Sequence, residues 1–268
     1  MKDIYNICAW NMRRSIKYLG INFVVFAICE TLFTFLLPDG SGGSVMRHPI
    51  IMFIFFLSFV SALLISAVPS IGMAFGKAHA DYTVMMLPIK RSKVLYGNIL
   101  TGILYEISAM CVQLLMFVAL YYPLRFIQPS KMFANTVFVD GERITTTVEK
   151  LHSGLFLHFV GNTFSDVLFP HSIIMFIAVA LAIIASAITL HCILMHTKGA
   201  RLLAFTACIA TGVCGVGGIM IPYFNGRFAA RGFTTADILS CIFFVCQIVI
   251  AALSLWWAIN AMNKAKNL

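Results

Sequence analysis

Two acidic residues, Glu30 and Glu106, lie inside long apolar stretches of this 268-residue chain. An ionisable side chain in the hydrocarbon core of a bilayer costs about 2.5–3.5 kcal/mol even on insertion scales, so such residues usually face a cavity or a partner. Each acid follows the start of its apolar stretch by 11 residues, which predicts a shared depth of about 16 Å if both helices run outward.

A pair of acids at one depth could bind a cationic peptide or drug in a translocation pathway. Glu30 and Glu106 are therefore candidate pathway residues. The alternative is that each acid is neutral, is hydrogen-bonded to a neighbouring helix or lies at a shallower depth.

Six apolar stretches of 19 to 28 residues would have to position these acids, at 19–37, 50–70, 95–122, 172–194, 202–222 and 238–260. Each is long enough to cross a bilayer, since a helix needs roughly 20 apolar residues to span roughly 30 Å of hydrocarbon. The chain is 60% hydrophobic and only 11% charged, with a mean hydropathy of +0.93, which excludes a water-soluble domain. We expect an all-α polytopic membrane protein with six transmembrane helices, forming a single membrane domain.

The basic residues predict the orientation of the chain in the membrane. The net charge is +9, but because the charges lie in short segments beside apolar spans, membrane topology explains them better than a nucleic-acid partner. With the N-terminus inside, 12 of the 19 Lys and Arg residues fall in cytoplasmic segments. We therefore expect a multi-pass protein of the cell membrane with both termini in the cytoplasm. No cysteine falls in the predicted outer loops, and no disulfide framework is indicated.

The first 18 residues predict an amphipathic helix on the inner leaflet, with Arg13, Arg14 and Lys17 as membrane-surface residues facing anionic head groups. The alternative is a frayed basic tail. The predicted apolar face consists of Tyr5, Cys8, Ala9, Met12, Ile16 and Leu19.

The cytosolic segment 71–94 combines a short potential helix at 81–87, a proline that stops it and a basic cluster. Asp81 is a possible N-cap of that helix. A mere connector would not need apolar side chains exposed to the cytosol, so the segment is a candidate for docking to another protein or to the bilayer surface. These apolar residues are Tyr82, Val84, Met85 and Met86.

The outer loop 123–171 is unusually long for a connection between spans. Asp140-Gly141 is a signature of a two-residue hairpin turn and separates two strand-like runs, 136–139 and 142–148. A helix at 151–159 would complete a small α/β extracellular loop. Such a loop could gate an exit or contact a partner subunit, and a plain solvated decoration is the alternative.

No catalytic or metal-binding constellation is evident in the chain. It contains neither H-E-x-x-H nor a phosphate loop of the form G-x-x-x-x-G-K-[ST], and no G-x-S-x nucleophile motif falls in the later spans. His191 and His196 are five residues apart, a poor spacing for a ligand pair, and we expect them near the inner interface. The sequence therefore predicts neither an enzyme nor a metal site.

One run of the cytosolic segment carries a family resemblance. Leu87-Pro88-Ile89-Lys90-Arg91-Ser92-Lys93-Val94-Leu95-Tyr96-Gly97 resembles the LPISRxxhhhGK stretch of ABC-2 type transporter permeases, particularly the small six-span subunits of bacitracin and lantibiotic-type peptide export and immunity systems. Asn98 stands where the family usually has Lys. By motif the resemblance covers about a dozen residues, while the order of the predicted elements matches over the whole chain.

The resemblance implies a permease subunit that exports a peptide, antimicrobial or amphipathic substrate. Two such subunits pair, as a homodimer or heterodimer, and each contacts a separate ATPase that binds ATP and Mg²⁺, while the permease itself holds no cofactor. The alternatives are a non-transporting membrane sensor or accessory subunit and an intramembrane enzyme. The residues expected to contact the ATPase are Asp81, Tyr82, Met85, Met86, Leu87, Pro88, Lys90 and Arg91, together with His196, Lys198 and Arg201 of the next cytosolic turn.

Overall fold

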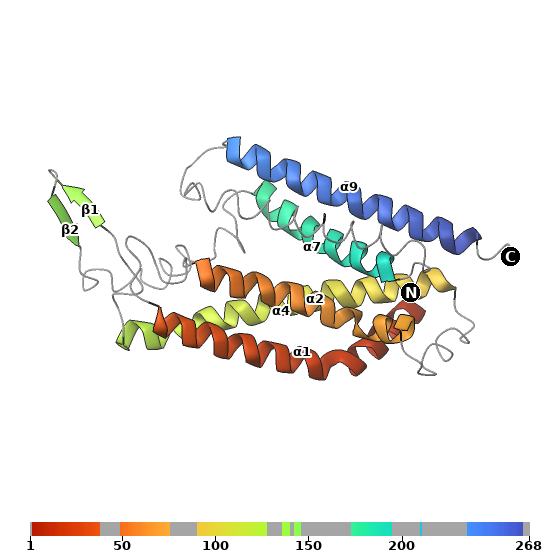
Figure 1. Ribbon diagram of the computed structural model, residues 1–268, viewed down its shortest axis with the longest axis horizontal. Helices are drawn as coiled ribbons and strands as arrows, with labels where there is room; N and C mark the ends of the chain where they lie inside the picture. The colour runs from red at the N-terminus through yellow and green to blue at the C-terminus, as the bar shows by residue number, and fades with distance from the viewer. Residues whose placement is uncertain are drawn as a thin grey trace. The chain divides into compact units, whose positions relative to one another are not determined.

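The computed structural model of the chain describes residues 2–37, 49–75, 90–127, 136–139, 142–145, 173–194, 210 and 235–264. Within these ranges the protein is almost entirely helical (Figure 1). The helices are α1 (Lys2–Leu36), α2 (Pro49–Phe75), α4 (Arg91–Ile127), α7 (Ile173–Leu194) and α9 (Thr235–Lys264).

Helices α2, α4 and α9 contain predicted apolar stretches, and α1 and α7 cover theirs except for one end residue each. The stretch at 202–222 lies outside the described residues except for Ala210. Within the part of the chain that the structure describes, three helical segments are long and apolar enough to cross a membrane, and two helices carry shorter apolar segments. The protein is therefore a helical, membrane-associated protein. The three long segments are Lys2–Leu36, Arg91–Leu124 and Cys241–Asn260, and the two shorter ones are Phe53–Pro69 and Ala180–Leu194.

Helix α1 differs from the prediction at its N-terminal end. The segment predicted to form a separate helix over 1–18 is continuous with the first apolar stretch. Of the predicted apolar face, Cys8 and Leu19 are buried in the protein, whereas Tyr5 is 70% and Ile16 is 53% exposed, so the contact of this face with the inner leaflet stays a prediction. The stripe that is buried against other helices consists of Ile7, Cys8, Asn11, Ser15 and Leu19. Polar groups turn inward here because they find partners on another helix, as they must where the surroundings are apolar.

Helix α4 begins four residues earlier and ends five residues later than the predicted span 95–122. Pro123 lies inside the helix, close enough to its C-terminal end that only one turn follows it. The extra length moves residues 123–127 from the predicted outer loop into the helix. At the other end, the backbone N–H of Lys93 donates to the carbonyl oxygen of Lys90 at 2.8 Å, which closes the first turn.

The predicted hairpin strands are present in the described part of the outer loop. Strand β1 (Thr136–Val139) pairs antiparallel with β2 (Glu142–Thr145), with Val139 opposite Glu142. A two-residue connection between paired strands is the arrangement that an Asp-Gly sequence favours. The helix predicted at 151–159 lies outside the described residues, so the α/β loop as a whole stays a prediction.

The chain divides into two compact units. The first consists of Met1–Gly20, Ser61–Ile107 and Ser172–Leu268. In it α7 and α9 run side by side (Figure 1), and Leu95, Ile99, Cys192 and Ala258 form a buried apolar cluster. The second unit consists of Ile21–Val60 and Ser108–His171.

Candidate functional site

Glu106 lies in the contact between α4 and α7. Its side chain is only 5% exposed, and its Oε1 atom is 2.7 Å from the hydroxyl oxygen of Ser186 on α7. The other carboxyl oxygen, Oε2, is buried without a hydrogen-bond partner. Glu106 is thus bonded to a neighbouring helix, which is the arrangement named above as the alternative to a pathway role. The pathway role itself stays a prediction.

Glu30 lies in the second unit and is 2% exposed. The Gln113 side chain of α4 hydrogen-bonds its carboxyl group, and the Gln113 Nε2 atom also donates to the hydroxyl oxygen of Ser58 on α2 at 2.9 Å. This acid too has a partner on a neighbouring helix. Because Glu30 and Glu106 belong to different units, their shared depth stays a prediction.

His191 of α7 is completely buried among the helices, and its position near the inner interface of the membrane stays a prediction. Its Nε2 atom is 3.2 Å from the hydroxyl oxygen of Ser66 on α2. Its ring fits against Gly102 of α4 so closely that a Cβ atom built at Gly102 would lie 3.0 Å from His191 Nε2 and 3.1 Å from the Ala187 Cβ atom. The glycine therefore allows α4 to approach the imidazole. The sequence analysis did not predict this contact. A histidine inside an apolar stretch indicates a partner on another helix, and this would have pointed to His191.

A seam of paired residues joins the first turns of α1 to the first half of α4. The Asn11 side-chain amide donates to Asn98 Oδ1 at 2.7 Å, and the hydroxyl groups of Ser15 and Tyr105 are 2.7 Å apart. One residue before Asn98, a Cβ atom built at Gly97 would meet the Ile7 Cγ2 atom at 2.7 Å. Asn98 is thus a buried partner of Asn11. It stands at the position where the family that the 87–97 run resembles usually has Lys.

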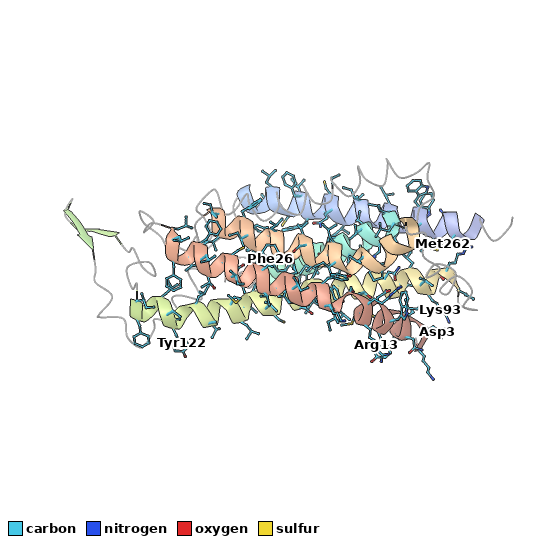
Figure 2. All side chains as sticks on the ribbon, turned by 60° about the horizontal axis from the view of Figure 1, so that its bottom comes forward. Asp3, Arg13, Phe26, Lys93, Tyr122 and Met262 are labelled. Carbon is cyan, nitrogen blue, oxygen red and sulfur yellow. The ribbon has the colours of Figure 1, made fainter. Side chains whose placement is uncertain are left out.

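The seam ends at an ion pair between Asp3 and Lys93 (Figure 2). Both side chains are partly exposed at the charged end of α1, outside its apolar stretch. The Lys93 ammonium group donates a hydrogen bond to Asp3 and lowers the pKa of that carboxyl group. Because the pair is exposed to solvent, we expect it to select the alignment of the two helices more than to stabilise them.

The basic residues predicted to face the cytosol or the membrane surface are exposed where the structure describes them. Lys90 and Arg91 are exposed at the first turn of α4, and Arg13, Arg14 and Lys17 are exposed on α1. The Arg14 guanidinium lies 4.7 Å from the centre of the Trp10 ring, a contact suited to a membrane–water boundary. The remaining predicted ATPase contacts, residues 81–88, His196, Lys198 and Arg201, lie outside the described residues.

Among the residues that the structure describes, no three His, Cys, Asp or Glu side chains are grouped so that they could hold a metal ion. Comparison of the chain with protein-family models, with curated proteins and with solved structures gives no match. A function for the chain is therefore inferred from its own residues.

Proposed function

We propose that the chain is the transmembrane permease subunit of an ATP-binding cassette exporter of the ABC-2 type. In this proposal it has six membrane-spanning helices with both termini in the cytoplasm, and it pairs with a second permease subunit. A separate ATPase drives the movement of a peptide, antimicrobial or amphipathic substrate. The 87–97 run supports the family, and the apolar helices support a role in the membrane.

One observation supports the mechanism most: α4 carries both the exposed basic pair and a buried acid. Lys90 and Arg91 lie at the beginning of this helix, and Glu106 lies 15 residues after Arg91 on the same continuous helix. At 1.5 Å per residue the separation along the axis is about 22 Å. A force applied at the basic end would therefore reach the acid through an unbroken helix.

The contacts of α4 specify which neighbours would respond to such a force. Near its beginning, Gly97 packs against Ile7 of α1, and farther along, Glu106 bonds Ser186 of α7. Packed helices move as discrete units because their side chains interdigitate. In the proposed cycle, ATPase closure displaces α4 together with the first turns of α1 and changes the α4–α7 contact that holds Glu106.

The first experiment is purification of the protein from its native membrane and identification of the subunits that remain bound. The proposal expects a subunit that contains a G-x-x-x-x-G-K-[ST] phosphate loop, together with ATP hydrolysis by the complex. Isolation of the protein without any nucleotide-binding subunit, in a form that senses or processes its ligand alone, would favour the sensor or enzyme alternatives.

The second experiment tests the contact itself by charge reversal at Lys90 and Arg91. Lys90→Glu/Arg91→Glu should still insert in the membrane but should lose the bound ATPase and transport coupled to ATP hydrolysis. The matched control is Arg13→Glu/Lys17→Glu, which makes the same change in charge at two exposed residues of α1 and should retain the ATPase. Unaltered coupling in the Lys90/Arg91 variant would count against this role.

A further inference from the structure

The hydroxyl group of Ser186 has two oxygen neighbours but only one hydrogen. It lies 2.7 Å from Glu106 Oε1 and 2.7 Å from the carbonyl oxygen of Ile183, one turn earlier on α7. A carbonyl oxygen can only accept a hydrogen bond, whereas a protonated carboxyl group can donate one. If Ser186 donates to Ile183, its contact with Glu106 is a hydrogen bond only when Glu106 is the donor.

The opposite arrangement is unfavourable. If Glu106 were ionised and accepted the Ser186 hydrogen, the hydroxyl oxygen and the Ile183 carbonyl oxygen would lie 2.7 Å apart with no hydrogen between them. Two oxygen lone pairs would then face each other at hydrogen-bond distance. The geometry therefore favours two successive hydrogen bonds, in which Glu106 donates from Oε1 to the Ser186 hydroxyl group and Ser186 donates to the carbonyl oxygen of Ile183.

Ser58 on α2 supplies an internal comparison in which chemistry fixes the direction. Its hydroxyl oxygen lies 2.7 Å from the carbonyl oxygen of Phe55 and 2.9 Å from Gln113 Nε2. The amide nitrogen of Gln113 can only donate, so Ser58 accepts from the neighbouring helix and donates within its own. Ser186 has the same pair of contacts, with a carboxyl group in the place of the amide.

The surroundings of Glu106 agree with a neutral acid. The side chain is 5% exposed and its Oε2 atom has no partner, so an ionised carboxylate would carry a desolvated charge with no compensating cation among the described residues. Two neighbouring buried titratable side chains of α7 and α4 have partners other than Glu106. His191 is within hydrogen-bond distance of Ser66 on α2, and Tyr105 of Ser15 on α1, while Gln247 of α9 donates to the carbonyl oxygen of Ala182.

We propose that Glu106 is a proton-binding site that the packing of α4 against α7 keeps occupied. When the two helices separate, water reaches the carboxyl group, the proton passes to that water, and a carboxylate remains. The proton site stands independently of the proposed function. If the chain is an exporter, Glu106 becomes negative, and attractive to a cationic substrate, only after α4 and α7 have parted.

Infrared difference spectroscopy of the purified protein in lipid at neutral pH tests the proton site directly. Subtracting the spectrum of Glu106→Gln from that of the native protein should reveal the carbonyl stretching band of a protonated carboxylic acid. Ser186→Ala should shift this band, because the acid loses its acceptor, and Glu30→Gln should leave the band in place. Carboxylate bands in place of the acid band would overturn the proposal.

The pH dependence of thermal stability provides a second readout. The protonated form holds the helix contact, so raising the pH until Glu106 ionises should lower the midpoint of thermal unfolding of the native protein. Glu106→Gln keeps a neutral donor for Ser186 and should lose less stability than the native protein over the same pH range. Parallel curves for the native protein and Glu106→Gln would contradict the link between the proton and the helix contact. Neither readout depends on transport or on an ATPase.

Discussion

Replacing Gly97 with alanine should weaken the contact between α1 and α4. The added Cβ atom would lie 2.7 Å from Ile7 Cγ2, 2.9 Å from Ile7 Cβ and 3.2 Å from the carbonyl oxygen of Ile4. Two of these three atoms belong to the backbone or sit directly on it, so rotation of the Ile7 side chain cannot relieve the clash. The helices must instead move apart.

The expected magnitude follows from two opposing effects. Overpacking a well-packed contact costs about 1–3 kcal/mol, while replacing a glycine inside a helix with alanine gains up to about 1 kcal/mol. The net loss in the free energy of unfolding for Gly97→Ala should therefore be roughly 0–2 kcal/mol. Gly102→Ala should lose less, because its closest contact is 3.0 Å and is made to the ring of His191.

Gly20→Ala is the matched control, because a Cβ atom at Gly20 of α1 would have no neighbour within 4 Å. The assay is thermal or denaturant unfolding of the purified variants in one detergent. We expect stability to increase in the order Gly97→Ala, Gly102→Ala, Gly20→Ala. Ile7→Ala removes the Cγ2 atom and should recover part of the loss in the double variant. Equal stabilities for Gly97→Ala and Gly20→Ala would refute the close approach of α1 to α4.

Three further perturbations test the polar contacts of the same seam. Asn11→Leu should lower the free energy of unfolding by about 1–3 kcal/mol, because the buried Asn98 loses its donor, and Asn11→Leu/Asn98→Leu should recover part of this loss in the same unfolding assay. Tyr105→Phe keeps the ring but removes the hydroxyl group that meets Ser15, so it should cost about 1 kcal/mol; an unchanged midpoint would show that this bond contributes nothing. Asp3 has a lowered pKa beside Lys93, so the contribution of the pair is present at neutral pH and is lost as the pH falls through that lowered pKa. Asp3→Asn should therefore be slightly less stable than the native protein at neutral pH and low salt, and the two should converge in acid or in high salt.

The helices could be predicted from the sequence because the length of an apolar run is a local property. The run that begins at Leu95 predicted α4, and the Asp140-Gly141 pair predicted the position of the β1–β2 connection. The ends of α4 were wrong by four or five residues, since polar residues such as Lys93 continue a helix when a neighbouring element supplies a partner.

The partners of the buried polar residues could not be predicted, because they depend on which helices become neighbours. Glu106 and Ser186 are 80 residues apart, and Ser66 and His191 are 125 residues apart. The buried stripe of α1 could not be predicted for a related reason. A helical wheel grouped apolar residues such as Tyr5, whereas the α4 contact buries Asn11 and Ser15 by satisfying their hydrogen bonds. A search for polar residues inside apolar stretches would have found these positions without their pairings.

The serine contacts affect the order in which the helices can pair during synthesis and membrane insertion. Each of Ser15, Ser58, Ser66 and Ser186 lies within hydrogen-bond distance of a carbonyl oxygen of its own helix, so it can enter the bilayer without exposing an unbonded hydrogen. Three of the side chains that meet these serines, Tyr105, Glu106 and Gln113, are on α4.

Synthesis proceeds from the N-terminus, so α1 and α2 are already in place when α4 emerges. Tyr105 and Gln113 can meet Ser15 and Ser58 at once. Glu106 must wait for Ser186, 80 residues downstream. During that interval Glu106 lacks the partner that it has in the folded protein, so the contact between α4 and α7 can form only after α7 has been synthesised.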